Sequence, residues 1–132
     1  MTYTPLLTTD DLAVTVPSNV NENFRKRAFL NIAVMTASFT VWADDSAGSP
    51  KDLYGVASAG GNVTVTLPPV ADADAAAGRV VTIFKVDAAN DVIIDGDGAE
   101  TINGAATITM SSQYDYRILF QAGGAWYVMG QN

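Results

Sequence analysis

Between residues 61 and 130 the chain is a nearly unbroken series of short segments in which apolar and polar residues alternate. The segments read NVTVTL, RVVTIFKV, DVIID, ATITM, YRILF and WYVM, and turns containing Gly, Pro, Asn or Asp separate them. Valine, isoleucine and threonine dominate, as expected for strands with one buried and one solvated face. The regular turn signals predict an all-β fold, a small antiparallel β-sandwich or barrel.

The stretch after the first of these strands carries signals for a turn and a helix. Pro68 and Pro69 end the strand, because proline cannot donate to a β-ladder. The following ADADAAA is rich in alanine, with acidic residues near its start, which predicts a single helical turn ended by Gly78. The strand RVVTIFKV is then expected to pair with DVIID through a turn at 88–90.

Two regions divide the chain by composition. Residues 1–28 are polar, contain two prolines and hold only short apolar runs, which predicts an extended N-terminal arm. Residues 29–132 are expected to form the β-domain, with 61–130 as its most regular part. LYGVASA predicts a further short strand ahead of that part.

The segment FLNIAVMTASFTVW is open to two interpretations. Its β-branched and aromatic content favours one strand. The face shared at a period of two would carry Ile32, Val34, Thr36, Ser38, Thr40 and Trp42. The alternative is a helix over residues 23–37, capped by Asn21 or Asn23.

Composition limits the classes of partner. The 132 residues fit one domain, and 48% hydrophobic against 16% charged residues predicts that some apolar surface lies against other subunits. A net charge of −7 argues against nucleic acid and against anionic membranes as partners. No secretory signal or membrane span is recognisable, so we expect a soluble protein made in a cytoplasm.

No catalytic or metal-binding pattern stands out. The chain has neither His nor Cys, and DGDGAE at 95–100 resembles a calcium loop but runs into a hairpin, so a turn is favoured. Asp44–Asp45 and Asp72 with Asp74 could act as paired carboxylates in glycoside hydrolysis, but nothing brings them together. We therefore expect no enzyme, no cofactor and no metal.

Aromatic and basic residues supply the candidate contact sites. Five aromatic side chains could form a sugar-stacking face, although core or trimer-interface packing is favoured: Trp42, Trp126, Tyr114, Tyr116 and Tyr127. In the favoured interpretation Tyr114 and Tyr116 share one face of a strand, Trp126 fills the core and Tyr127 caps an interface. The basic triplet Arg25, Lys26 and Arg27 is either a solvated charge run or a docking site for an acidic capsid surface.

Four short motifs stand in order along residues 61–130. They are Pro68–Pro69, Gly78–Arg79, Glu100–Thr101–Ile102–Asn103–Gly104 and Trp126–Tyr127. In this order they resemble a β-module of virion proteins of tailed bacteriophages, in which LPP, a Gly-Arg or Gly-Lys strand, a T-I-N-G hairpin and a final W-Y-V strand follow one another. Residues 1–60 carry no such resemblance.

The resemblance implies a virion structural protein, since such modules occur in tail fibres, tailspikes, head fibres and capsid decoration proteins, often as trimers. A short chain without heptads favours a homotrimeric capsid decoration (cement) protein on the capsid exterior, bound to the major capsid protein or another virion protein. The alternatives are the receptor-binding tip of a tail or head fibre, or a carbohydrate-binding module for a host-surface glycan.

Overall fold

The structure is a computed structural model that describes residues 32–43 and 51–132. Its elements in chain order are β1 (Ile32–Met35), β2 (Phe39–Thr40), β3 (Leu53–Val56), β4 (Val63–Thr66), α3 (Ala73–Ala76), β5 (Val81–Lys85), β6 (Val92–Asp95), β7 (Thr107–Met110), β8 (Tyr116–Ala122) and β9 (Ala125–Gln131). The prediction of a β-rich fold is confirmed, with the single helical turn at α3.

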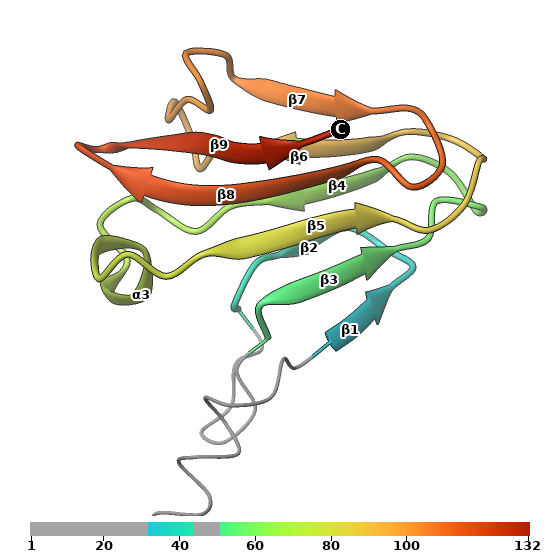
Figure 1. Cartoon of the computed structure of the whole chain (residues 1–132), viewed down its shortest axis with the longest axis horizontal. Coiled ribbons are helices and arrows are strands. Elements are labelled where there is room, and N and C mark those ends of the chain that lie inside the picture. Colours follow the sequence, from blue (N-terminus) through green and yellow to red (C-terminus); the bar gives the residue numbers. More distant parts are fainter. Residues whose placement is uncertain (1–31, 44–50) are drawn as a thin grey trace, which may run out of the picture.

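The strands form two sheets that lie as two layers (Figure 1). A five-stranded sheet has the order β1-β3-β5-β8-β9, and a four-stranded sheet has the order β2-β4-β6-β7. The first six strands alternate between the two sheets, and within each sheet they pair in parallel. This part of the chain is therefore a coil in which each turn, here called a rung, gives one strand to each sheet.

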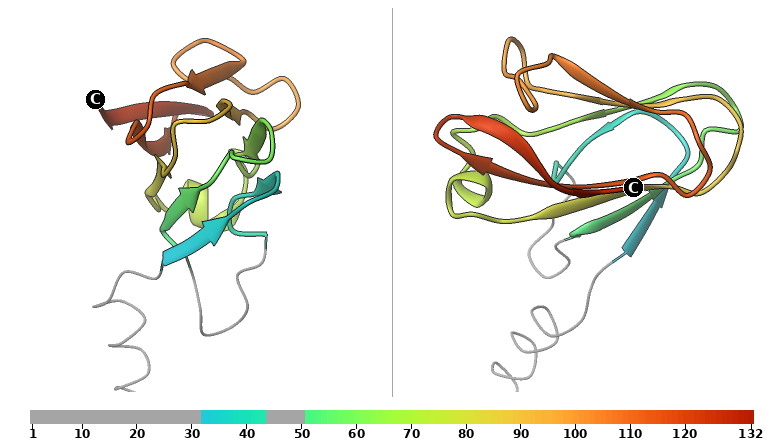
Figure 2. Two further views of the ribbon diagram at one scale, coloured as in Figure 1. Left: turned by 90° about the vertical axis from the view of Figure 1, so that its right-hand side faces the viewer. Right: turned by 45° about the horizontal axis from the view of Figure 1, so that its top comes forward.

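The second and third rungs stack in a constant register. Leu53 pairs with Thr82 in one sheet and Val63 pairs with Val92 in the other, an offset of 29 residues in both. The turns that carry the chain from one sheet to the other therefore lie side by side at one end of the molecule (Figure 2). Residue for residue, 53–66 lies over 82–95 without a gap.

Antiparallel strands cover the third rung. β7 pairs with β6, and the β8–β9 hairpin pairs with β5 through β8. A β-bulge interrupts the hairpin, where Ile118 pairs with Gly130 and Leu119 with Val128. The coil thus ends in strands that run against it, and it does not close into a barrel.

Both sheets contribute their inward side chains to one core. Its buried apolar residues are Val41, Trp42, Tyr54, Val56, Val63, Val65, Leu67, Ala75, Val81, Ile83, Val92, Ile94, Ile102, Met110, Leu119 and Trp126. Strands β4, β5 and β6 bury every second side chain, as the alternating sequence predicts.

Two expectations about strand pairing and one about the extent of a strand are wrong. The sheets are mixed and not antiparallel, and β5 does not form a hairpin with β6, because the turn at 86–91 carries the chain into the other sheet. The segment 32–42 is not one strand. It bends after Met35, so that Ile32 and Val34 point outward on one sheet while Trp42 is buried. The alternative helix is also excluded over the residues 32–37 that the structure describes.

The helical turn forms as its sequence predicts. Asp72 caps α3, because its carboxylate accepts from the backbone N–H groups of Asp74 and Ala75. Gly78 follows with a φ of 88°, in the left-handed region that glycine adopts without strain. In the described ranges, no helix has the length and apolar character needed to cross a membrane.

Candidate functional site

The outer surface of the five-stranded sheet is the candidate functional site. Strand alternation and register place on it side chains from all five strands: Ile32, Val34, Leu53, Thr82, Phe84, Tyr116, Ile118, Phe120 and Tyr127, with Gly55 and Gly130 between them. We call this surface the apolar face.

Three large side chains of the apolar face are exposed, and the others named on it are half-buried. Ile32 and Val34 are 62% and 67% exposed, and Tyr127 is 41% exposed. At the β8–β9 hairpin the rings of Phe120 and Tyr127 lie 5.8 Å apart between centroids. An array of this size on one sheet is more than the scattered apolar residues of an ordinary surface, and such patches mark interaction sites.

None of the outward positions on the apolar face carries a charge. Arg117 pairs with Ile83, whose side chain is fully buried, so Arg117 faces inward. Lys85 is also buried. The surface can therefore form van der Waals and hydrophobic contacts, with hydrogen bonds from Thr82 and the tyrosine hydroxyls only.

The outer surface of the four-stranded sheet differs in character. Register places there Thr40, Thr64, Thr66, Ile93, Asp95, Thr107 and Thr109. Threonine hydroxyls and one carboxylate dominate this hydroxyl face, which is the solvated side that the alternating sequence predicts. The two layers of the protein thus present opposite surfaces.

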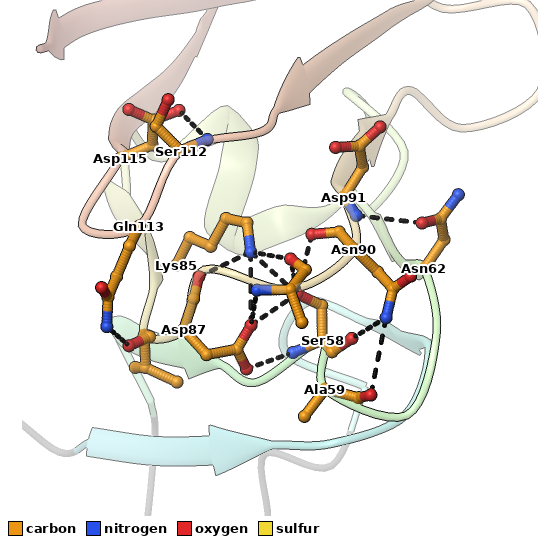
Figure 3. A network of polar contacts seen from close by, with 12 residues as sticks. Ser58, Ala59, Asn62, Lys85, Asp87, Asn90, Asp91, Ser112, Gln113 and Asp115 are labelled. Atoms are coloured by element: carbon orange, nitrogen blue, oxygen red, sulfur yellow. Dashed lines mark hydrogen bonds and ion pairs between the residues drawn. The ribbon is translucent and has the colours of Figure 1, made fainter.

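A polar cluster at the turns holds the second and third rungs together (Figure 3). The Lys85 side chain is fully buried, and its Nζ donates to Ser58 Oγ at 2.9 Å and to the backbone carbonyls of Asp87 and Ala89. The Asn90 side chain donates to the Ser58 carbonyl at 2.7 Å. The Lys85 ammonium and the Asn90 amide thus both have acceptors within the cluster, which is what makes a buried ammonium tolerable.

Asp87 completes this cluster. Its carboxylate accepts from the Ser58 backbone N–H at 2.8 Å and lies 3.3 Å from Lys85 Nζ. Desolvation of the Asp87 carboxyl opposes ionisation, but the hydrogen bonds from Ser58 and Lys85 and the attraction to Lys85 outweigh it, so the pKa of Asp87 is lowered. The cluster therefore joins the turns of two successive rungs.

A second polar cluster lies at the opposite ends of the strands, around Arg79. Its Nε pairs with Asp52 at 2.8 Å and its Nη1 with Asp74 at 2.9 Å. The guanidinium carbon lies 4.3 Å from the centroid of the Trp42 ring, a cation–π distance. Arg79 thereby joins the start of β3, the helical turn and the core.

The five predicted aromatic residues lie in three different settings. Trp126 and Trp42 are buried, with ring centroids 6.2 Å apart, so neither can stack on a sugar. Tyr127 and Tyr116 lie on the apolar face. Tyr114 does not share a strand with Tyr116, because it precedes β8 in a turn with a φ of 70°. It is 59% exposed and stacks on Phe84 with centroids 6.1 Å apart.

The candidate carboxylates serve structural contacts. Asp72 caps α3 and Asp74 pairs with Arg79. The stretch 95–100 forms a turn, and Glu100 accepts the Val70 backbone N–H. Across residues 32–43 and 51–132, no three side chains of metal-ligating type gather into a site. Asp44, Asp45 and the triplet at 25–27 lie outside the described residues.

The apolar face and the Lys85 cluster were both missed at the sequence level. A signal for the first was present in Ile118–Phe120, where three apolar residues follow one another and make both sides of β8 apolar. The sequence gives no clear signal for the second, because 53–66 and 82–95, which pair in the structure, are identical only at Ala59 with Ala88 and Val63 with Val92. No protein-family model matches the chain, and no curated protein matches it.

Proposed function

We propose that the protein is a structural component of a tailed-bacteriophage virion, a homotrimeric decoration protein that binds the capsid exterior and stabilises the head. The observation that carries the proposal is the apolar face, an uncharged surface that extends over all five strands of one sheet. Such a surface suits contact between protein subunits. The resemblance of residues 61–130 to phage virion modules supplies the setting.

The use of ionisable side chains supports the same role. Lys85, Asp87, Arg79 and Glu100 are engaged in contacts that join rungs and loops. Their hydrogen bonds and ion pairs stabilise the fold. The proposal therefore assigns no catalytic step, cofactor or metal to the protein.

The mechanism would be mechanical. A trimer that contacts neighbouring capsid subunits at several points gains from multivalency, because each further contact forms at high effective concentration. Residues 1–28, with the basic triplet 25–27, are proposed to bind the major capsid protein, and the β-body to hold the subunits of the trimer together.

A second candidate function is the receptor-binding tip of a tail or head fibre. The observation that favours it is the exposure of two tyrosine rings, Tyr114 and Tyr127, which could stack on a host-surface glycan. A fibre tip would be present in few copies, whereas a decoration protein covers the head.

Quantitative mass spectrometry of purified virions, with antibody labelling in electron microscopy, tests the proposal. Labelling over the head at a copy number comparable to that of the capsid subunits is expected. Labelling confined to the tail would favour the fibre tip, and absence from virions would overturn both. As a further arm, deletion of residues 2–27 should leave a folded body that no longer binds undecorated heads. Unchanged binding would assign capsid attachment to the body.

A further inference from the structure

We infer that the apolar face is the surface through which copies of this chain associate with one another. The inference rests on the proposed function in so far as it names the partner that this face binds. Its occupant is another copy of this chain, and because a closed trimer needs a head-to-tail contact, one part of the face in one copy contacts a different part of the face in the next.

The distribution of charge over the chain limits which partner the apolar face can bind. The chain carries a net charge of −7, so two copies repel each other wherever their ordinary surfaces meet. Contact through the apolar face avoids this charge repulsion, because no outward position on it is ionisable except the tyrosines. A basic or nucleic-acid partner would instead be matched by carboxylates or by Lys and Arg, and neither is found there.

The β8–β9 hairpin is the expected centre of the contact. Phe120 and Tyr127 form a ring pair there, and Met129, the extra residue of the bulge, is 63% exposed. Tyrosine and other aromatic residues dominate the binding energy of protein interfaces, and methionine adapts its shape to a neighbour. These side chains can be covered without ordering any loop, because they stand on paired strands.

The hydroxyl face provides the contrast within the same molecule. It is also the outer side of a mixed sheet, but its threonines and Asp95 hydrogen-bond well to water. Covering it would cost the desolvation of those groups without an apolar gain. The two faces therefore have different roles, with the apolar face toward other copies and the hydroxyl face toward solvent.

The size of the apolar face sets the expected strength of association. Five strands about 4.8 Å apart span about 20 Å, and strands of four to seven residues extend roughly 13 to 23 Å. The projected area is then about 400 Å², below the ~800 Å² that each partner buries in a standard stable interface. We therefore expect association that depends on protein concentration and is half complete in the micromolar range.

Light scattering and sedimentation of the full chain, from about 1 to 100 µM, test the inference. The wild type should rise toward three times 13.8 kDa with concentration. The Tyr127→Lys variant should require at least about tenfold higher concentration, because it places a charge in the contact. Val34→Lys, at the other side of the same face, should act in the same direction.

The matched control is Thr109→Lys, which places the same charge on the outward side of β7 in the hydroxyl face. It should associate like the wild type, and circular dichroism should show that all three variants are folded. Equal association of Tyr127→Lys and wild type, or equal loss in Thr109→Lys, would overturn the assignment of the face. A wild type that stays monomeric throughout would overturn self-association itself. Virion copy number is measured separately, so association in solution without a place on virions would reject only the proposed function.

Discussion

Ser58 and Asp87 occupy equivalent positions in two stacked turns 29 residues apart, and the Ser58 backbone N–H donates to the Asp87 carboxylate over 2.8 Å. The Ser58 hydroxyl lies 3.0 Å from the same carboxyl group. One rung thus supplies donors and the next rung supplies the acceptor, in the place where successive turns must stay in register. Lys85 then neutralises the carboxylate from inside the body.

Replacement of Lys85 by valine is expected to destabilise the protein by about 2–4 kcal/mol. It leaves the carbonyls of Asp87 and Ala89 without their ammonium donor, and breaking a buried pair costs more than the pair contributes. We place the figure below that of a fully buried pair, since the Asp87 side chain is 25% exposed. Urea unfolding followed by fluorescence measures the loss.

The matched control is the double variant Lys85→Val with Asp87→Ser, which copies the Val56 and Ser58 of the preceding rung. It removes the uncompensated carboxylate, and we expect it to lose less stability than Lys85→Val alone. If the double variant is the less stable of the two, the cluster does not act through charge pairing.

Acid should weaken the protein partly through Asp87. Because the pKa of Asp87 is lowered in the folded state from an ordinary value of 3.8, the folded protein binds this proton less readily than the unfolded chain. The stability contributed by Asp87 is present above that ordinary value and is lost as the pH falls through the lowered pKa. The free energy of unfolding, measured from about pH 6 to pH 2, should therefore fall more steeply in wild type than in Asp87→Asn. Parallel profiles would contradict this.

Gly96 is expected to resist substitution. A Cβ at this position would meet the backbone carbonyl of Glu100, whose side chain accepts the Val70 N–H. Gly96→Ala should cost about 1–3 kcal/mol, because the obstacle is backbone and cannot rotate away. Gly60→Ala is the control. Apart from its chain neighbours, no atom would lie within 4 Å of a Cβ added at Gly60, and stability should change by less than about 0.5 kcal/mol. Equal melting temperatures of Gly96→Ala and Gly60→Ala in calorimetry would contradict this, because the turn at 96–100 would then have shifted to accommodate the added methyl group.

Arg79→Lys should be costly despite the retained charge. Lysine cannot reproduce the two ion pairs with Asp52 and Asp74 together with the contact to the Trp42 ring. A loss of about 1–2 kcal/mol is expected, with a change in native tryptophan fluorescence. Arg117→Lys is the comparison, because Arg117 Nε has no hydrogen-bond partner among the described residues. A larger loss in Arg117→Lys than in Arg79→Lys would contradict this account.

Strand positions were predictable from the sequence, whereas strand partners were not. Alternation and turn residues are read from neighbouring positions in the sequence, so segments such as NVTVTL and DVIID predicted β4 and β6. Pairing in a parallel coil joins residues 29 apart, and only Ala59 with Ala88 and Val63 with Val92 are identical across the matched rungs. A short turn between two strands predicts a hairpin by default, which is why β5 and β6 were wrongly paired.

The sequence predicted that an apolar contact surface exists, but not where it lies. A high hydrophobic content in a lightly charged chain indicated contact with other subunits, and Tyr127 and Tyr116 do lie outward. The position of the face depends on which strands share a sheet, and that is a property of the coil. Tyr114 was misplaced because a left-handed backbone at a tyrosine leaves no mark in an alternating pattern.

The constant offset between the second and third rungs makes one turn of the coil a unit of length. Repeating a segment such as 57–85 once would present the same edges above and below, so that the body could lengthen by a whole rung while β7 and the β8–β9 hairpin still covered its end. An insertion of one residue within a strand would instead exchange its inward and outward side chains. We therefore expect the molecule to accept changes of length in whole turns, with both of its faces keeping their character.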